Sequence, residues 1–368
     1  MNERDAKAEI WHGRRVGSAR APEVLGVDVA YANDELWDRL PELLAGCEKI
    51  VYRSGEDEAR DREFNEACTE LRAGVRRGIA APMQVVDTSL WLHELRLCKT
   101  ESELERMRRA AAITAEAHVE AMRQAQPGVN EAEIDALLEY TFRRRGGTGA
   151  AYNNIVAGGA NACILHYVEN NAPLVDGDLL LIDAGCEVEY YASDVTRTFP
   201  VNGTFSPEQR AIYEVVLDAQ KLAVAAVRPD ATSVQLHEIA LRRLVEGLLE
   251  LGLLSGTVET VLESKSYERF FMHKTGHWLG LDVHDQGTYF DSEGNSRPLR
   301  PGMVLTVEPG LYVGPDDESV EARWRGIGVR IEDDVLVTES GQENLTASIP
   351  KEVEEVEAVC SGRELARA

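Results

Sequence analysis

The sequence has no paired cysteines, and this absence excludes two kinds of site. Its six cysteines, at positions 47, 68, 98, 163, 186 and 360, are scattered and form no CxxC pair. Such a pattern is not typical of a zinc–thiolate site or of a disulfide framework. We therefore expect reduced thiols and a cytoplasmic location.

Long apolar runs and an excess of positive charge are missing as well. No run approaches the about 20 residues that span a bilayer, and the opening residues MNERDAKAEI contain no apolar stretch of a signal peptide. With 39 Lys and Arg against 64 Asp and Glu, the net charge is −25. This charge argues against a nucleic acid or an anionic membrane surface as a partner.

Several motifs of nucleotide-binding proteins and serine hydrolases are also absent. The chain has no GxSxG elbow and no P-loop, and GIGVRI (326–331) lacks the third glycine of a dinucleotide-binding fingerprint. An apolar content of 44% nevertheless suffices for a large core. At 368 residues the chain is longer than one typical domain, so we expect a main domain and a smaller one.

A domain boundary is predicted near Thr100. Residues 1–97 mix a strand candidate (49–53) with a helix candidate (61–77) and contain no dense motif. At the boundary, TESE forms a capping box that opens a helix through Met122. We expect a small α/β domain before the boundary and the main domain after it.

The main domain contains one order of elements twice: a helix, a proline turn, a second helix and then strands. The two copies include QPGVNEAEIDALLEYTFRRRGG (126–147) and RPDATSVQLHEIALRRLVEGLLELG (228–252). Strand candidates follow each copy, namely NNIVAG (153–158), ACILHYV (162–168), DLLLIDAG (178–185), YYASDVTRTF (190–199) and the strand-rich region 270–338. This order predicts an α+β fold of two related halves with a site at their junction.

Two aspartates lie at the ends of a predicted hairpin within IDAGCEVEYYASDVTRTF (182–199). If the chain reverses between Val188 and Glu189, Asp183 and Asp194 are directly opposed, with Cβ atoms about 4.5–5.5 Å apart. Like charges in that position repel each other. A cation between the two carboxylates is therefore predicted.

Three later segments add further metal-ligating residue types. FFMHKTGHWLGLDVHD (270–285) contains three of the eight histidines, LTVEPGLYV (305–313) contains Glu308, and GIGVRIEDDVLVT (326–338) contains Glu332. Each alone has an ordinary structural explanation, such as a solvated carboxylate, a histidine packed beside Trp278, or a surface pair of Glu332 with Arg330. The HExxH pattern of a zinc-binding helix is absent.

The combination favours a metal site. Two aspartates, two glutamates and a histidine follow apolar strands, where ionised groups are costly unless compensated. A pair of divalent ions provides that compensation. Oxygen-rich ligands favour Mn²⁺ or a similar ion over one that prefers thiolates.

The motifs IDAGCEVEYYASDVTRTFPV, HWLGLDVHD, GMVLTVEPGLYV and RGIGVRIEDD resemble the metallopeptidase family with the pita-bread fold. Within it they are most similar to the aminopeptidase P (Xaa-Pro aminopeptidase) group, with prolidase next. The resemblance implies a pita-bread catalytic domain of two related halves at 98–350. A shortened, partial α/β N-terminal domain (1–97) precedes it, and a C-terminal tail (351–368) follows it.

The resemblance also implies roles for single residues. Asp194 and Glu332 would bridge two divalent ions, most simply Mn²⁺ with Co²⁺ or Zn²⁺ as alternatives, and Glu308 would also act as the general base. His277 and Glu308 would complete the coordination of one ion, and bidentate Asp183 would complete that of the other. The implied catalytic residues besides Glu308 are His166, His273, His284 and Arg330, which face the substrate. The implied substrate-binding residues are His166, His284 and Tyr312.

The implied activity is release of the N-terminal residue from peptides with proline at the second position. Alternatives are a prolidase that acts on Xaa-Pro dipeptides, or a non-catalytic pita-bread protein that binds peptides or partners. A homo-oligomer, either dimer or tetramer, is also implied. Two positions depart from the family's usual residues: Lys274 replaces a small residue, and Trp324 replaces a frequent tyrosine.

Overall fold

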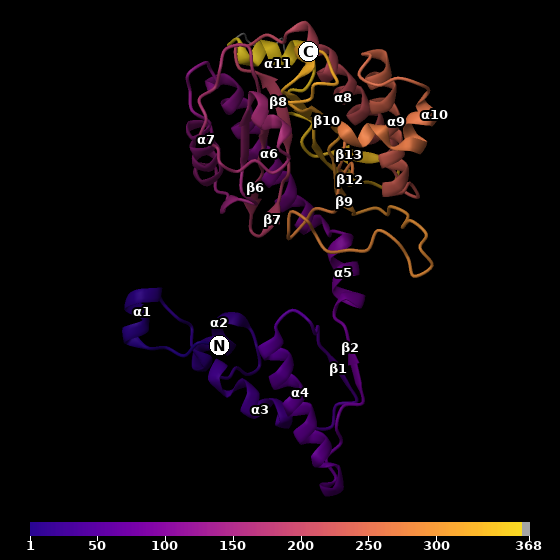
Figure 1. The fold of residues 1–368 in the computed structure, drawn as a ribbon. Helices are drawn as coiled ribbons and strands as arrows, with labels where there is room; N and C mark the ends of the chain where they lie inside the picture. The colour runs from indigo at the N-terminus through magenta and orange to yellow at the C-terminus, as the bar shows by residue number, and fades with distance from the viewer. Residues whose placement is uncertain (363–368) are drawn as a thin grey trace. The chain divides into compact units, whose positions relative to one another are not determined.

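The structure, a computed structural model, describes residues 1–362 and divides into two compact units, Met1–Leu92 and a second one that begins at His93 (Figure 1). Residues 363–368 of the predicted tail lie outside the described residues. The first unit contains the helices α1 (Ala6–His12), α2 (Ala21–Leu25), α3 (Leu36–Leu44) and α4 (Glu58–Ala73) and the strands β1 (Lys49–Val51) and β2 (Gln84–Val86).

The first unit has a small core around α4. Asp57 caps this helix by accepting hydrogen bonds from the amides of Ala59 and Arg60, so the helix begins three residues earlier than predicted. Strands β1 and β2 pair in parallel, and Ile50 of β1 and Phe64 of α4 are buried in one cluster. The predicted α/β character of this region follows from these elements.

Helix α5 (Ser89–Leu97) leads into the second unit. The helices of that unit are α6 (Glu101–Gln124), α7 (Glu131–Arg144), α8 (Pro207–Ala226), α9 (Ser233–Glu250), α10 (Val258–Ser264) and α11 (Val353–Cys360). Its strands are β3 (Gly149–Ala150), β4 (Ile155–Gly158), β5 (Leu179–Asp183), β6 (Cys186–Val188), β7 (Tyr191–Ala192), β8 (Thr196–Pro200), β9 (Val304–Val307), β10 (Gly310–Val313), β11 (Ile327–Arg330), β12 (Asp333–Val337) and β13 (Gln342–Asn344).

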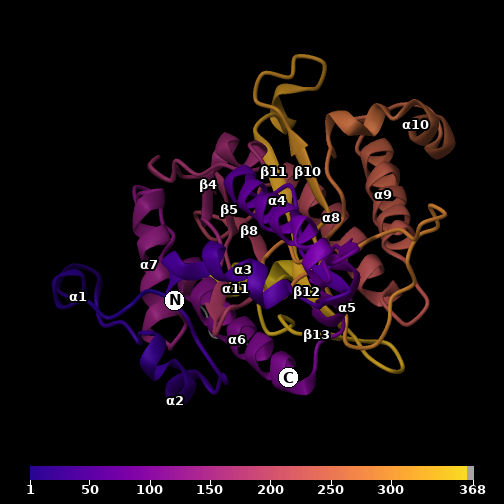
Figure 2. The same ribbon diagram turned by 90° about the horizontal axis from the view of Figure 1, so that it is seen from below.

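Helix starts in the second unit follow the capping signals of the sequence. A capping box opens each long helix of this unit. In each box the capping side chain accepts from the amide of the third helical residue, and the side chain of that residue accepts from the capping amide. The capping residues are Thr100, Asn130, Ser206 and Thr232. Helices α7 and α9 lie on opposite sides of the strands in both ribbon views (Figures 1 and 2). The strands thus lie between one helix of the first half and one helix of the second.

The strands form short antiparallel sheets with the orders β4-β5-β8, β13-β12-β9, β3-β6-β7 and β10-β11. The largest buried cluster joins residues of α6, α7, α8 and α9 to residues of these strands. Helix α11 adds Val353, Val356 and Val359 to it. Among residues 1–362, no helix combines the length and the apolar character that a membrane span requires.

The predicted register of the β5–β8 hairpin is wrong. Asp183 pairs with Thr196, not with Asp194, because the chain reverses at Glu189 and Tyr190 instead of one residue earlier. Both turn residues have positive φ angles, 49° and 73°, as a two-residue turn that matches the strand twist requires. Asp194 therefore lies between β7 and β8, two residues before the partner of Asp183.

Residues 162–168 form no strand, contrary to the prediction. The buried carboxylate of Glu131 accepts hydrogen bonds from the Gly158 amide, the Asn161 side chain, the Tyr167 hydroxyl and the Ala172 amide. These four donors wrap the segment around one carboxylate. The segment is consequently a loop, and it places His166 on an exposed surface.

A buried ion pair fastens the start of the second unit to the histidine-rich segment 270–285. The Lys99 ammonium lies 3.3 Å from Asp285, and both side chains are 1% exposed. Arg96 contacts the same carboxylate and also Asp282, at 2.6 Å. Because Asp285 follows His284 directly, this attachment fixes the backbone next to a predicted substrate-facing residue.

We predict that Asp285→Ala lowers the unfolding free energy of the second unit by about 3–5 kcal/mol, because it leaves the Lys99 ammonium buried without its partner. Chemical denaturation of the metal-free protein measures this loss. The matched control is Glu259→Ala, which removes an exposed pair with Arg242 and should cost about 0–1 kcal/mol. Equal effects of the two substitutions would contradict the assignment.

Candidate metal centre

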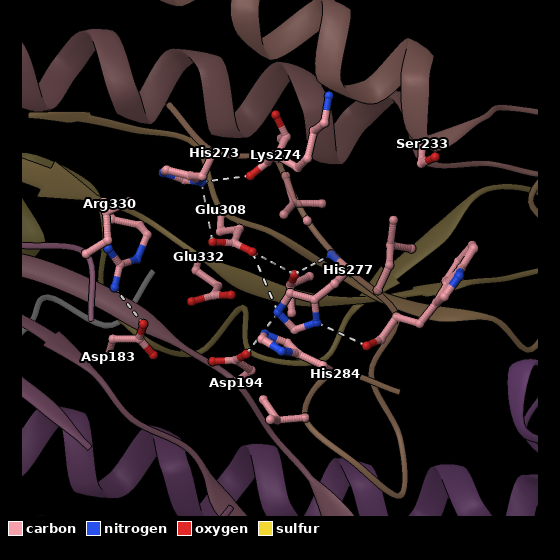
Figure 3. Close-up of a pocket in the computed structure, with 18 of the residues that line it drawn as sticks. Asp183, Asp194, Ser233, His273, Lys274, His277, His284, Glu308, Arg330 and Glu332 are labelled. Atoms are coloured by element: carbon pink, nitrogen blue, oxygen red, sulfur yellow. Dashed lines mark hydrogen bonds and ion pairs between the residues drawn. The ribbon is translucent and has the colours of Figure 1, made fainter. Parts of the chain in front are cut away.

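The structure brings the five predicted metal ligands into one cavity of about 710 Å³ (Figure 3). Each of them stands where a strand ends or where the chain passes between strands. Asp183 ends β5, and Asp194 lies between β7 and β8, both in the first half. From the second half, Glu308 follows β9 and Glu332 lies between β11 and β12, while His277 precedes the bridge of Trp278 to β9.

The ligand atoms of this cluster are close to one another. Nε2 of His277 lies 3.3 Å from Oδ2 of Asp194 and 3.6 Å from Oε1 of Glu308. One ligand atom each of Asp194, His277 and Glu332 falls within 4.8 Å of the other two. Asp183 joins the cluster through the Tyr152 hydroxyl, which contacts Asp183 at 2.6 Å and also contacts Asp194. Carboxylates from both halves therefore share one small volume.

Neighbouring groups orient the ligands. Nδ1 of His277 donates to the Trp278 carbonyl at 3.0 Å, which directs Nε2 toward the carboxylates. The Thr196 hydroxyl donates to Glu332 at 2.6 Å, and the same residue pairs with Asp183 across the hairpin. The predicted ligands are thus held in place by neighbouring hydrogen-bonding groups.

Asp334 orients Asp194, another predicted ligand, through the backbone. Its carboxylate accepts hydrogen bonds from the Ser193 hydroxyl at 2.8 Å and from the backbone amide of Asp194 at 3.2 Å. Burial raises the pKa of Asp334 well above its ordinary value, and the nearby Asp194 charge adds to this. The side chain therefore positions the Asp194 backbone from a fully buried site.

Burial and neighbouring charges shift the pKa values of the cluster. Burial raises the pKa of Glu308 to about 7 and that of Glu332 well above its ordinary value, and neighbouring carboxylates contribute to the second shift. Burial also raises the pKa of Asp183, although the Arg330 charge opposes it. Burial alone would lower the pKa of His277, but its hydrogen bond with Asp194 and the nearby carboxylates raise it to about 9. The raised pKa values mean that these side chains hold protons where positive charge is otherwise lacking. Divalent cations would supply that positive charge, so the carboxylate and imidazole donors fit them.

Comparison with known proteins assigns the family. Residues 105–339 match the family described as Metallopeptidase family M24, and residues 1–52 match the domain described as Aminopeptidase P, N-terminal domain. The chain belongs to metallopeptidase family M24. The family predicted from the sequence motifs is thereby confirmed.

Relatives of this M24 chain match nearly its full length. The Xaa-Pro aminopeptidase of Escherichia coli (strain K12) is 47% identical over 356 residues, which cover 97% of this chain and 80% of the relative. The structure of Pseudomonas aeruginosa aminopeptidase PepP matches with a TM-score of 0.94 and 46% identity, covering 98% of this chain and 81% of that one. Zinc-substituted E. coli aminopeptidase P in complex with product gives the same TM-score and identity, over 99% and 82%. The predicted α+β pita-bread fold is confirmed by these matches.

The predicted substrate-facing residues occupy different layers of the M24 cavity. The cavity is lined by His273, His284, His166 and Arg330, and His166 lies on the exposed loop. Tyr312 is buried behind them: its hydroxyl accepts from Arg330 at 3.0 Å and contacts Nε2 of His273 at 2.9 Å. Nδ1 of His273 donates to the Lys274 carbonyl, and burial lowers the pKa of this imidazole to about 4. His273 is therefore neutral and firmly oriented.

Sequence reasoning missed two residues of the cavity. Tyr152 bridges two ligand carboxylates, yet it stands in AYNNI, a stretch with no motif. His237 of α9 bonds the Thr275 hydroxyl at 2.8 Å, and burial lowers its pKa to about 4. The small number of histidines in the chain is the one signal that could have identified His237.

The stability of the metal-free protein should fall as the pH rises. Glu308 has a folded pKa of about 7 against an ordinary 4.5, so its stabilising contribution is complete below pH 4.5 and is lost by about pH 7. The contribution of His277, with a folded pKa of about 9 against 6.5, is lost between those values. We predict a lower melting temperature at pH 9 than at pH 6 in thermal unfolding of chelator-stripped protein.

Metal binding should reverse this trend because cations displace the bound protons. The rise in melting temperature on adding saturating Mn²⁺ is expected to be larger at pH 8 than at pH 6. Glu308→Gln is the matched variant, since it removes the titrating carboxylate but keeps the shape. An equal Mn²⁺ effect at both pH values would contradict the electrostatic account.

Proposed function

We propose that this chain is a metal-dependent aminopeptidase that releases the N-terminal residue from peptides with proline at the second position. The observation that supports this best is the convergence of Asp183, Asp194, His277, Glu308 and Glu332 on one cavity of a chain 47% identical to an Xaa-Pro aminopeptidase. These five residues would hold the cations. When bound, such ions polarise a carbonyl and lower the pKa of water toward neutrality.

The protein's own groups account for proton transfer and orientation. Glu308 has a raised pKa, about 7, and its carboxylate is open to the cavity, which suits it to accept a proton near neutral pH. His273 lies 3.8 Å from Glu308 and is held by Tyr312. Together with His284 and His166 it forms the wall that would face the scissile carbonyl and stabilise the charge that develops on its oxygen.

Recognition of proline has to work without a hydrogen bond at the scissile bond, because an imide nitrogen carries no hydrogen. The cavity supplies apolar surface for the ring, from Ile155, Leu165, Leu236 and Trp278 among others. The carboxylate cluster attracts the free N-terminal amine of a peptide. The apolar surface favours the proline ring, and the carboxylates favour a substrate whose cationic end enters the cavity.

Further details belong to the same proposal. The site would hold two ions, with Mn²⁺ as the first choice for its oxygen-rich ligands and Co²⁺ or Zn²⁺ as alternatives. All six cysteines carry free thiols, which supports a reducing, cytoplasmic location. We also propose a homo-oligomer, a dimer or a tetramer.

The decisive test is hydrolysis of an Xaa-Pro-Xaa tripeptide and an Xaa-Pro dipeptide by chelator-stripped protein, with and without Mn²⁺. We expect metal-dependent cleavage of the tripeptide with release of the free N-terminal residue. Cleavage of the dipeptide alone would identify a prolidase. Binding of both peptides without any cleavage would identify a non-catalytic binding protein.

Glu308→Gln should lower kcat by about 10²- to 10⁴-fold, as expected for loss of a general base. The comparison variant is Glu354→Gln, which changes an exposed residue of α11 and should leave kcat unchanged. Because Glu308 is also a proposed ligand, bound metal is measured in parallel by elemental analysis. Full activity in Glu308→Gln would contradict its role.

A further inference from the structure

Lys274 is the one cation lining the cavity whose charged group is unpaired within residues 1–362. The cavity is also lined by Arg330, but that guanidinium donates to Asp183, Thr196 and Tyr312. The ammonium of Lys274 has no hydrogen-bond or ion-pair partner in the part of the chain that the structure describes, and the residue is exposed. A free positive charge therefore lies in a cavity whose acids all belong to the metal cluster.

The backbone at Lys274 is fixed beside the cluster. Its carbonyl accepts from Nδ1 of His273 at 2.7 Å, and the next carbonyl, of Thr275, accepts from the amide of Glu308 at 2.8 Å. From this anchored position the side chain extends away from the carboxylates (Figure 3). The backbone of Lys274 is thus fixed next to the proposed reacting groups, while its ammonium is unpaired among residues 1–362.

The groups around the free end do not neutralise it. His237 lines the same part of the cavity, and burial together with the Lys274 charge keeps the pKa of this imidazole at about 4. Ser233 and Thr275 line it too and are uncharged. The cavity is consequently bipolar, with the carboxylate cluster in one part and an uncompensated ammonium in another.

We propose that Lys274 binds a carboxylate of the substrate on the leaving-group side of the scissile bond. This inference rests on the proposed function and specifies its substrate class. In an extended peptide, a carboxylate on the residue after proline lies about 7 Å from the scissile carbonyl. A four-carbon lysine stem anchored beside the cluster can cover such a distance. The ligand is either the C-terminal carboxylate of a tripeptide or an acidic side chain at the third position.

Binding of the leaving dipeptide tests this without turnover. Titration calorimetry with Mn²⁺-loaded protein compares Pro-Leu as the free acid with Pro-Leu amide. We expect the acid to bind more tightly than the amide, by about 3- to 10-fold, as for one charged contact at a partly exposed site. Lys274→Met should abolish this ratio and Lys274→Arg should retain it.

The matched control is Lys265→Met, which removes an exposed lysine outside the cavity and should leave the ratio unchanged. A second pair of ligands, Pro-Asp amide and Pro-Asn amide, distinguishes a side-chain carboxylate from the C-terminal one. Equal binding of acid and amide in both pairs, or an unchanged ratio in Lys274→Met, would overturn the proposal.

Kinetics then separate this inference from the proposed function. The tripeptide Xaa-Pro-Leu should have a lower KM than its amide, and Lys274→Met should remove that difference. Discrimination in binding without any cleavage would support the Lys274 site and reject the aminopeptidase. Cleavage without discrimination between acid and amide would support the aminopeptidase and reject the Lys274 site.

Discussion

Mutual repulsion among four carboxylates in one cavity is the constraint on which the second unit depends. Two of them come from the first half and two from the second, so the halves meet at a point of concentrated negative charge. Burial raises the pKa values of Glu308, Glu332 and Asp183, and the charges of the neighbouring carboxylates raise them further. Divalent cations bound between the carboxylates would replace repulsion by attraction, and the same residues would then link the two halves.

A second layer of buried charge keeps this link rigid. Directly after Glu332, the fully buried Asp333 accepts from Arg197 at 2.7 Å and from Gln220 at 2.8 Å, which joins β12 to β8 and α8. Asp334 fixes the backbone of Asp194 from the same strand. Asp333 cannot move without leaving the Arg197 charge buried and without its partner. The geometry of the proposed ligands is therefore set by the core.

The sequence predicted those features that local chemistry determines. Capping boxes marked the starts of the long helices, and the polar residues after apolar strands are ones that converge on one cavity. It failed where the outcome depends on distant groups or on turn conformation. The loop at 162–168 follows from the buried Glu131, which lies far from it in sequence, and the hairpin register follows from two positive φ angles at Glu189 and Tyr190. Tyr152 was missed because only the folded chain brings its hydroxyl to Asp183 and Asp194.

The central claim is that cations occupy the space between these carboxylates. The most direct test is an anomalous difference map from crystals of Mn²⁺-loaded protein, recorded near the manganese absorption edge. The account predicts two peaks about 3.5–4 Å apart, with Asp194 and Glu332 contacting both and His277 contacting one. An ordered cavity with no peak, or with peaks away from these carboxylates, would contradict it.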